Sequence, residues 1–194
     1  MNGLINRAVE CFVRDGYGDP FWQEVTAALG LGEAAFEPLM PCEREVTARL
    51  VAGRAAGLDV VALDAPALFD RPGGPYADAT GRDWPDNHLR FAALSHAAAA
   101  LAQGADRDWR PDVLHLHDWQ TGLAPVYLHQ RAGPRPATVL TIHNVAFQGL
   151  FPASVIGPLG LDRSGFAQDG YEFWGKVGFL KGALVHADRI TTVS

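Results

Sequence analysis

From residue 58 onward, short apolar segments alternate with segments long enough to form helices, and this alternation limits the possible folds more than any other feature. Strands separated by helices of about ten or more residues are typical of a parallel sheet with helices on both faces. The apolar segments are rich in β-branched residues without strict alternation, as expected for strands buried on both faces. The predicted strands are residues 58–63, 113–117, 137–142 and 189–193, and the predicted helices are residues 87–103, 122–131 and 171–186.

The first fifty residues have a different pattern, with amphipathic helical segments at 4–13, 21–29 and 44–56 and no evident strand. The change in pattern indicates a boundary between about residues 40 and 52. We therefore divide the chain into a small helical segment, residues 1–50, and an α/β region, residues 53–194.

Composition excludes several classes of protein. A net charge of −6 disfavours nucleic acid as a partner. No apolar run approaches the roughly 20 residues of a membrane span, and Arg7, Glu10 and Arg14 interrupt the apolar start, so we expect no membrane, no signal peptide and a cytoplasmic location. Cys11 and Cys42 are too few for a zinc site or a disulfide framework.

Residues 112–125 (DVLHLHDWQTGLAP) place polar side chains at the carboxyl end of a predicted strand, the edge at which open α/β sheets bind ligands. His115 and His117 point to one face and so match part of a metal site, but no third ligand is evident, and we favour a packing role for His115. Asp118 and Trp119 follow directly. A carboxylate accepts hydrogen bonds from sugar hydroxyls and an indole covers an apolar sugar face, while the alternative for Asp118 is to cap the next helix.

Residues 141–152 (TIHNVAFQGLFP) repeat this pattern after the next strand. His143 and Asn144 stand at the strand end, and a loop with Phe147 and Phe151 follows. Exposing two aromatic rings is unfavourable unless they pack or bind, so we favour a binding site over a buried turn.

A third segment, residues 64–87, is rich in proline, glycine, aspartate and aromatic residues and too polar for a core. Its side chains suit either sugar binding or turn formation, and both interpretations stay open at this point. The residues concerned are Asp70, Tyr76, Asp83, Trp84 and Asp86.

These segments resemble the bacterial glycogen synthase and plant starch synthase family over about residues 53–194. The motifs are LFDRPGGPY, DNHLRFAALSHAA, PDVLHLHDWQTGLAPVYL, TIHNVAFQGLFP and GKVGFLKGALVHADRITTVS. The resemblance implies the N-terminal half of a GT-B glycosyltransferase, in which two Rossmann-like domains face each other across a cleft. It also implies transfer of glucose from ADP-glucose to the non-reducing end of an α-1,4-glucan with retention, with no metal ion and no cofactor.

The same resemblance gives five residues a role. His143 is similar to the family histidine beside the donor glucose, which contacts the sugar and helps to stabilise positive charge at the anomeric carbon. Asn144 resembles its neighbour in the sugar pocket. Asp118 and Trp119 resemble the pair that lines the glucosyl and acceptor side, and Tyr76 resembles the tyrosine of a turn ending in Pro-Tyr. The predicted site is thus His143 as the catalytic residue, with the other four binding substrate.

Two features depart from the family pattern. The family opens with a strand and a Lys-Thr-Gly-Gly loop that hold the donor, whereas this sequence has no such loop and its only lysines are Lys176 and Lys181. The family also continues into a C-terminal nucleotide-binding domain that handles the diphosphate and ribose. We therefore expect that domain to be required for activity and the 194 residues alone to be inactive.

Residues 1–41 show a weaker resemblance to the start of haem-dependent nitric-oxide-binding domains. No histidine precedes His88, so the ligand-bearing part of that family is absent and we expect no haem. The main alternative to a glucosyltransferase fragment is a non-catalytic glucan-binding or regulatory module, and a gas sensor is the least favoured function.

Overall fold

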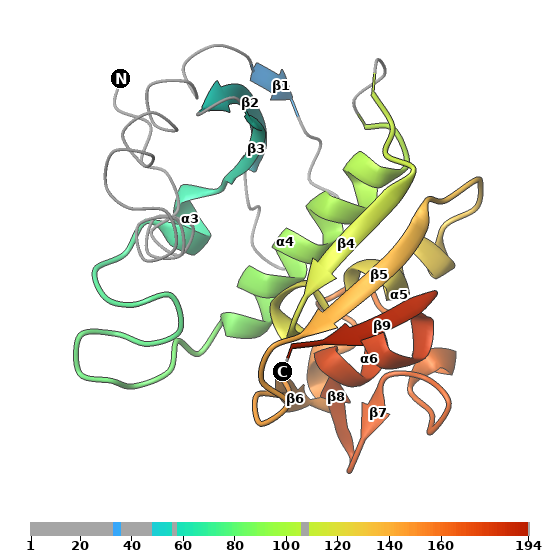
Figure 1. Ribbon diagram of the computed structural model, residues 1–194. Coiled ribbons are helices and arrows are strands. Elements are labelled where there is room, and N and C mark those ends of the chain that lie inside the picture. Colours follow the sequence, from blue (N-terminus) through green and yellow to red (C-terminus); the bar gives the residue numbers. More distant parts are fainter. Residues whose placement is uncertain (1–32, 36–47, 56–57, 106–108, 194) are drawn as a thin grey trace. The chain divides into compact units, whose positions relative to one another are not determined.

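The computed structural model describes residues 33–35, 48–55, 58–105 and 109–193 (Figure 1). These residues form two compact units: the described residues up to Asn87 belong to the first, and those from His88 onward to the second. The helices predicted at 4–13 and 21–29 lie outside the described residues.

The first unit contains a three-stranded antiparallel sheet in the order β1-β2-β3. The strands are β1 (Glu33–Ala35), β2 (Arg49–Ala55) and β3 (Leu58–Asp64). The register places Arg49 opposite Asp64 and Arg54 opposite Asp59, and the two pairs have N–O distances of 2.8 and 3.5 Å. A one-turn helix, α3 (Pro66–Phe69), follows β3 and carries proline in its first turn, where a missing N–H costs nothing.

This sheet contradicts three predictions. β1 lies within the first fifty residues, where no strand was expected. Residues 49–55 form β2 instead of continuing the helix predicted at 44–56, and β3, predicted as a strand at 58–63, pairs with β2 instead of joining the parallel sheet. Only Ala56 and Gly57 separate the two strands, and so short a connection permits antiparallel pairing but no parallel crossover. The pairing outweighs the helix propensity of alanine, arginine and leucine.

The second unit contains the predicted parallel sheet, in the order β4-β5-β9. Its strands are β4 (Val113–His117), β5 (Ala137–Ile142) and β9 (Arg189–Thr192), and both pairings are parallel. Three of the four predicted core strands are therefore confirmed. The carboxyl ends of β4 and β5 lie next to each other, because His117 is in register with Thr141.

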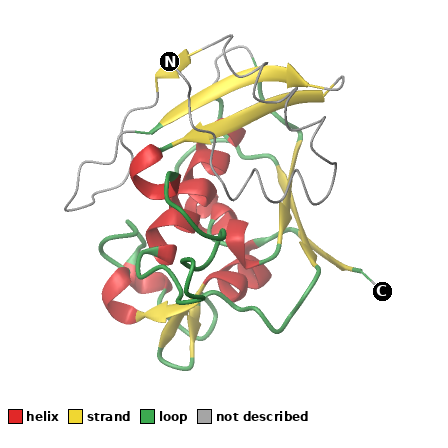
Figure 2. Ribbon diagram, turned by 90° about the vertical axis from the view of Figure 1, so that its left-hand side faces the viewer, coloured by secondary structure: helices red, strands yellow, loops and turns green. Residues whose placement is uncertain are grey.

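Three helices belong to this sheet: α4 (Asn87–Ala102), α5 (Ala124–Gln130) and α6 (Phe179–His186). The first two confirm the predicted helices. In Figure 2 these three helices lie on one side of the sheet formed by β4, β5 and β9. Leu116 and Leu140 are buried on that side, whereas Val113 is 52% exposed on the other. Among the described residues, helices therefore cover one face of the sheet, where the sequence predicted both.

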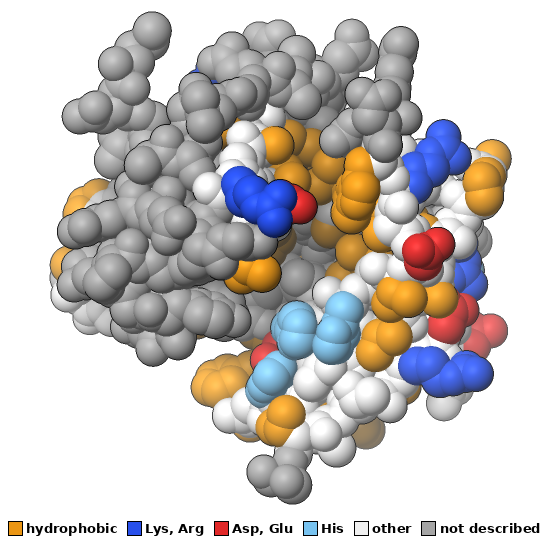
Figure 3. Space-filling view, turned by 45° about the horizontal axis from the view of Figure 1, so that its top comes forward, with side chains coloured by type: hydrophobic (Ala, Val, Ile, Leu, Met, Phe, Trp, Pro, Cys, Tyr) orange, Lys and Arg blue, Asp and Glu red, His pale blue; other side chains and the backbone are white. Residues whose placement is uncertain are grey.

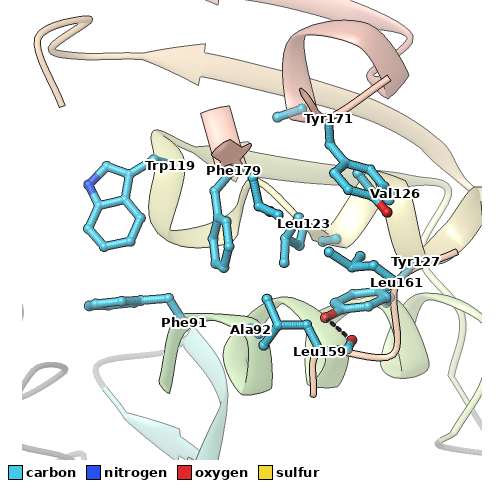
Figure 4. Packing of buried hydrophobic residues seen from close by; sticks show 14 of the residues in the cluster. Phe91, Ala92, Trp119, Leu123, Val126, Tyr127, Leu159, Leu161, Tyr171 and Phe179 are labelled. Carbon is cyan, nitrogen blue, oxygen red and sulfur yellow. Dashed lines mark hydrogen bonds between the residues drawn. The ribbon is translucent and has the colours of Figure 1, made fainter. Parts of the chain in front are cut away.

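The core of the second unit is an apolar cluster in which Phe91, Trp119, Leu123 and Phe179 pack together (Figure 4). Buried polar groups in it are satisfied locally: the Tyr127 hydroxyl donates to the Leu159 carbonyl oxygen at 2.8 Å.

No helix among the described residues has the length and apolarity needed to cross a membrane.

A second antiparallel sheet, in the order β6-β8-β7, precedes α6. It comprises β6 (Leu150–Pro152), β7 (Glu172–Phe173) and β8 (Lys176–Gly178), and short 3-10 helices lie at Trp119–Thr121, Ala153–Val155 and Arg163–Gly165. The helix predicted from residue 171 is therefore wrong in its first half and begins at Phe179. Trp174 and Gly175, both at positive φ (52° and 74°), form a two-residue hairpin turn that ends any helix there.

Candidate active site

Asp118 joins the ends of the two neighbouring strands β4 and β5. Its Oδ1 accepts hydrogen bonds from the backbone N–H groups of His143 and Asn144, at 2.7 and 3.3 Å. Its own N–H donates to the Thr141 carbonyl oxygen at 3.0 Å and so extends the pairing of the strands. Asp118 precedes the 3-10 helix Trp119–Thr121, but its side chain makes no capping bond there. The alternative helix-capping role is therefore wrong, because the carboxylate is directed to the neighbouring strand end.

The backbone of Asp118 is strained. Its φ of 53° and ψ of −164° lie close to a region that glycine occupies almost alone, and such conformations cost about 1–3 kcal/mol. Strain of this kind is concentrated at functional sites, where the surrounding structure holds the residue in place. The two N–H groups that Asp118 binds supply part of that restraint.

Three histidines gather beside this strand end, on the sheet face that no described helix covers. His115 and His117 point to one face of β4, with ring centroids 4.4 Å apart, and the ring of His143 lies 5.3 Å from that of His117. Nδ1 of His117 lies 3.0 Å from Nε2 of His143. Figure 3 shows histidine side chains grouped on one surface of the molecule.

His115 is exposed, so the prediction that it packs in the core is wrong: its side chain points away from the helices. Its Nε2 lies 2.7 Å from the Thr141 hydroxyl, which in turn lies 2.7 Å from the hydroxyl of Thr191. Within the described residues, no group of three or more histidine, cysteine, aspartate or glutamate side chains is arranged to hold a metal ion.

The electrostatics of this cluster favour a neutral His117. Partial burial lowers the pKa of its imidazole, and positive charge on His115 or His143 would lower it further, while the carboxylate of Asp118 opposes the shift. His117 therefore loses its proton at a lower pH than an isolated histidine, and near pH 7 it acts as a neutral hydrogen-bonding group.

Trp119 is directed into the core. It is 8% exposed, and its ring lies 4.6 Å from that of Phe91 in an edge-to-face contact, with Phe151 and Phe179 slightly further away. Its role in covering a sugar stays a prediction, while the structure gives the ring a packing role beneath the strand end that carries Asp118. Phe151, the second aromatic of the predicted loop, packs in the same group.

The loop after His143 combines internal hydrogen bonds with exposed apolar side chains. Asn144 Oδ1 accepts from the Ala146 N–H at 3.0 Å, and the Gln148 side chain donates to the Val145 carbonyl. Val145 and Phe147 are 65% and 63% exposed. The loop is thus a defined turn that presents an apolar surface close to His143.

Tyr76 belongs to the first unit. Its carbonyl oxygen accepts hydrogen bonds from the Asn87 side chain and the Trp84 N–H, at 2.8 and 3.0 Å. Tyr76 is 42% exposed. Arg71 binds both carboxylate oxygens of Asp86 and lies over the Trp84 ring, 5.0 Å from its centroid. Trp84 and Asp86 therefore stabilise the segment, and Tyr76 stays a predicted ligand contact.

The predicted site omitted two histidines of this cluster, His115 and His117, and only His117 contacts His143 directly. Its contact with His143 had a detectable signal: a histidine that ends one parallel strand and a histidine just past the end of the next reach the same sheet edge. The spacing of His115 and His117 drew attention to metal binding instead.

These features define the second unit as a Rossmann-like α/β domain with polar side chains gathered at the carboxyl edge of its parallel sheet. The family model for the starch synthase catalytic domain matches residues 17–194, so the chain belongs to that family. The match includes residues 17–41, which lie within the segment that resembles the haem-dependent domains.

Relatives and a solved structure agree with this membership. A glycogen synthase of Roseobacter denitrificans is 58% identical over 147 residues, which cover 76% of this chain and 31% of that protein. A glycogen synthase of Rhodopseudomonas palustris strain TIE-1 is 57% identical over 148 residues, with the same coverage. The chain thus spans about a third of the length of these relatives.

The catalytic domain of Starch Synthase IV from Arabidopsis thaliana, bound to ADP and acarbose, superposes with a TM-score of 0.65 at 27% identity. The alignment covers 84% of this chain and 32% of that chain. The predicted fold class is therefore confirmed: the chain contains part of a Rossmann-like domain of a GT-B glycosyltransferase.

Proposed function

We propose that this chain supplies the donor-glucose side of a glycogen synthase that transfers glucose from ADP-glucose to the non-reducing end of an α-1,4-glucan with retention. The observation that carries the proposal is the bond network of Asp118, which ties His143 and Asn144 to the end of β4. The similarity to a starch synthase bound to ADP and acarbose supports these substrates.

The chemistry of the site suits this reaction. As the nucleotide diphosphate departs, positive charge develops at the anomeric carbon, and groups fixed in advance stabilise it without reorganisation. In our proposal His143 is the catalytic residue that contacts the sugar, and its ring is held at the sheet edge beside Asp118 and His117. Asn144 and Asp118 bind sugar hydroxyls.

The other two predicted residues have supporting roles. We propose that Trp119 holds the end of β4 through its aromatic contacts and that Tyr76 binds sugar through its exposed ring. Phe147 adds an exposed aromatic surface for the apolar face of a glucose unit.

The decisive test is incorporation of labelled glucose from ADP-glucose into glycogen, with the protein purified in the length in which the cell makes it. His143→Ala should lower the rate by about a hundred- to a thousandfold, as for the loss of one preorganised group. His129→Ala removes an exposed histidine on α5 and is the matched control, which should retain the rate. Equal rates for wild type and His143→Ala would refute the proposal.

A non-catalytic glucan-binding module is the second candidate, favoured by the exposure of Val145 and Phe147. The transfer assay, run beside affinity electrophoresis in glycogen, separates the two functions. A binding module loses its retardation with Phe147→Ala and shows no transfer at any length of the protein. Because the 194 residues correspond to about 31% of the relatives' length, we expect them alone to bind glucan without elongating it.

A further inference from the structure

The contact between His117 and His143 joins two residues that are far apart in the sequence. His117 is the last residue of β4 and pairs with Thr141 on β5, and His143 follows Thr141 by two residues. The parallel register thus brings the two rings together at the sheet edge, with Nδ1 of His117 and Nε2 of His143 3.0 Å apart. This distance is that of an N–H···N hydrogen bond.

Such a pair holds a single hydrogen between its two nitrogens. One ring donates and the other accepts, so the tautomer of one ring fixes that of the other. Two imidazolium rings would direct two N–H groups at each other, and the pair therefore does not take up a second proton without breaking the contact. The bond therefore restrains the orientation of the His143 ring and couples the tautomers of the two rings.

The backbone of His143 is fixed separately, because its N–H donates to Asp118 Oδ1 at 2.7 Å. His117 is itself anchored: its N–H donates to the Thr121 hydroxyl at 3.0 Å, and that hydroxyl donates back to the His117 carbonyl at 3.0 Å. Asp118 thus holds the main chain of His143, and an anchored His117 holds its ring.

We propose that His117 is a positioning residue for His143: its ring holds the His143 imidazole in one rotamer and couples its tautomer to that of His117, so that Nδ1 of His143 is directed at the sugar. The functional part of this proposal rests on the proposed function, whereas the hydrogen bond itself does not. The lowered pKa of His117 agrees with a neutral partner that stays in place near pH 7. The ionisable groups that face it are His115, His143 and Asp118.

The hydrogen bond is tested directly by nuclear magnetic resonance on the ¹⁵N-labelled 194-residue chain without ligand. A scalar coupling across the hydrogen bond, between Nδ1 of His117 and Nε2 of His143, is expected. His117→Phe and His143→Gln should each abolish it, and His115→Phe, which alters the same face of β4 without touching His143, should retain it. Absence of the coupling in the wild-type chain would overturn the proposal whatever the variants do.

The positioning role is tested by kinetics on the protein in the length in which the cell makes it. His117→Phe keeps the ring shape but removes the nitrogen, and it should lower kcat by about ten- to a hundredfold while KM for glucan changes by less than about threefold. His117→Asn, which places a polar atom at the position of Nδ1, should recover most of the loss. A phenylalanine variant with wild-type kcat would refute the role.

The two proposals fail in different ways. If His143→Ala abolishes transfer and His117→Phe does not, the positioning role is refuted and the proposed function stands. If the coupling is present but His143→Ala transfers glucose normally, the proposed function is refuted, and with it the role of His117 in this reaction.

Discussion

Gly149 ends the loop that follows His143, at a point where a methyl group has no room. Its φ is +61°, and a Cβ atom there would lie 2.8 Å from Trp119 Cδ2 and closer still to Cε3. The Gly149 carbonyl also accepts from the Phe179 N–H at 3.0 Å, which ties the loop to the start of α6. Gly149→Ala therefore perturbs the packing beneath the site without altering any proposed ligand contact.

Two contributions set the size of the effect. A left-handed conformation costs an alanine about 1–2 kcal/mol. Overpacking adds about 1–3 kcal/mol, because Trp119 is held between Phe91 and Phe179 and has little freedom to retreat. The expected loss is about 2–5 kcal/mol in the free energy of unfolding, or a fall in Tm of about 5–15 °C for a chain of this size.

Gly175→Ala is the matched control. Gly175 has a φ of +74° and no atom within 4 Å of the position of an added Cβ, so only the backbone contribution applies. Urea denaturation followed by circular dichroism should give a loss of about 1–2 kcal/mol for this variant. The difference between the two alanine variants measures the clash with the indole.

A double-mutant cycle tests the cause. In a Trp119→Leu background the smaller side chain leaves room for the methyl group, so Gly149→Ala should cost about the same as Gly175→Ala. Equal costs of the two glycine substitutions in the wild-type background would refute the argument, since the indole would then present no obstacle to the added methyl group.

Three further predictions concern backbone strain and charge. Asp118→Gly relieves the positive-φ strain that Asp118→Ala retains, so urea denaturation should find the glycine variant more stable by about 1–2 kcal/mol, while both lose glucose transfer. Burial, and then the charge of Arg131, lowers the pKa of His96 to about 4, and Arg131 donates to its Nε2 at 2.7 Å. Below about pH 6.5 the His96 ring is protonated in the unfolded chain but not in the folded chain, so the free energy of unfolding should fall by on the order of 2 kcal/mol between pH 6.5 and 4. His96→Gln should remove this part of the pH dependence. The hydrogen bond from Arg135 contributes most to lowering the pKa of Asp188. Oδ2 of Asp188 also accepts a hydrogen bond from the Thr138 N–H at 2.8 Å. Asp188→Asn should cost about 1 kcal/mol at pH 7 and less at pH 2, and equal costs at both pH values would contradict this assignment.

The local sequence pattern was sufficient to predict the strands of the parallel sheet and the polar residues at its carboxyl edge. The segments that form β4 and β5 are short, apolar and β-branched, and each is followed directly by polar residues, so their strand ends were visible in the sequence. Since parallel strands place their carboxyl ends at one edge, the proximity of Asp118 to His143 and Asn144 could also be predicted. The hydrogen bonds from both backbone N–H groups to Asp118 confirm that these residues converge.

In the first unit the local sequence pattern predicted the wrong secondary structure. Residues 49–55 carry alanine, arginine and leucine, which favour a helix in isolation, yet they form β2 because β3 pairs with them along their length. The late start of the helix predicted at 171–186 has a similar cause, since residues 172–178 form β7, β8 and the turn between them instead.

The sequence by itself thus determined the α/β class, which segments form the parallel strands and which polar residues lie at their ends. These features follow from local composition and from the shared direction of parallel strands. Only the tertiary structure decided which face the helices cover, and hence that Trp119 is buried and His115 exposed. It also decided the register that brings His117 within 3.0 Å of His143. The strand pattern places both histidines at one sheet edge, but the distance between rings 26 positions apart depends on the register and on side-chain packing, which no local pattern encodes.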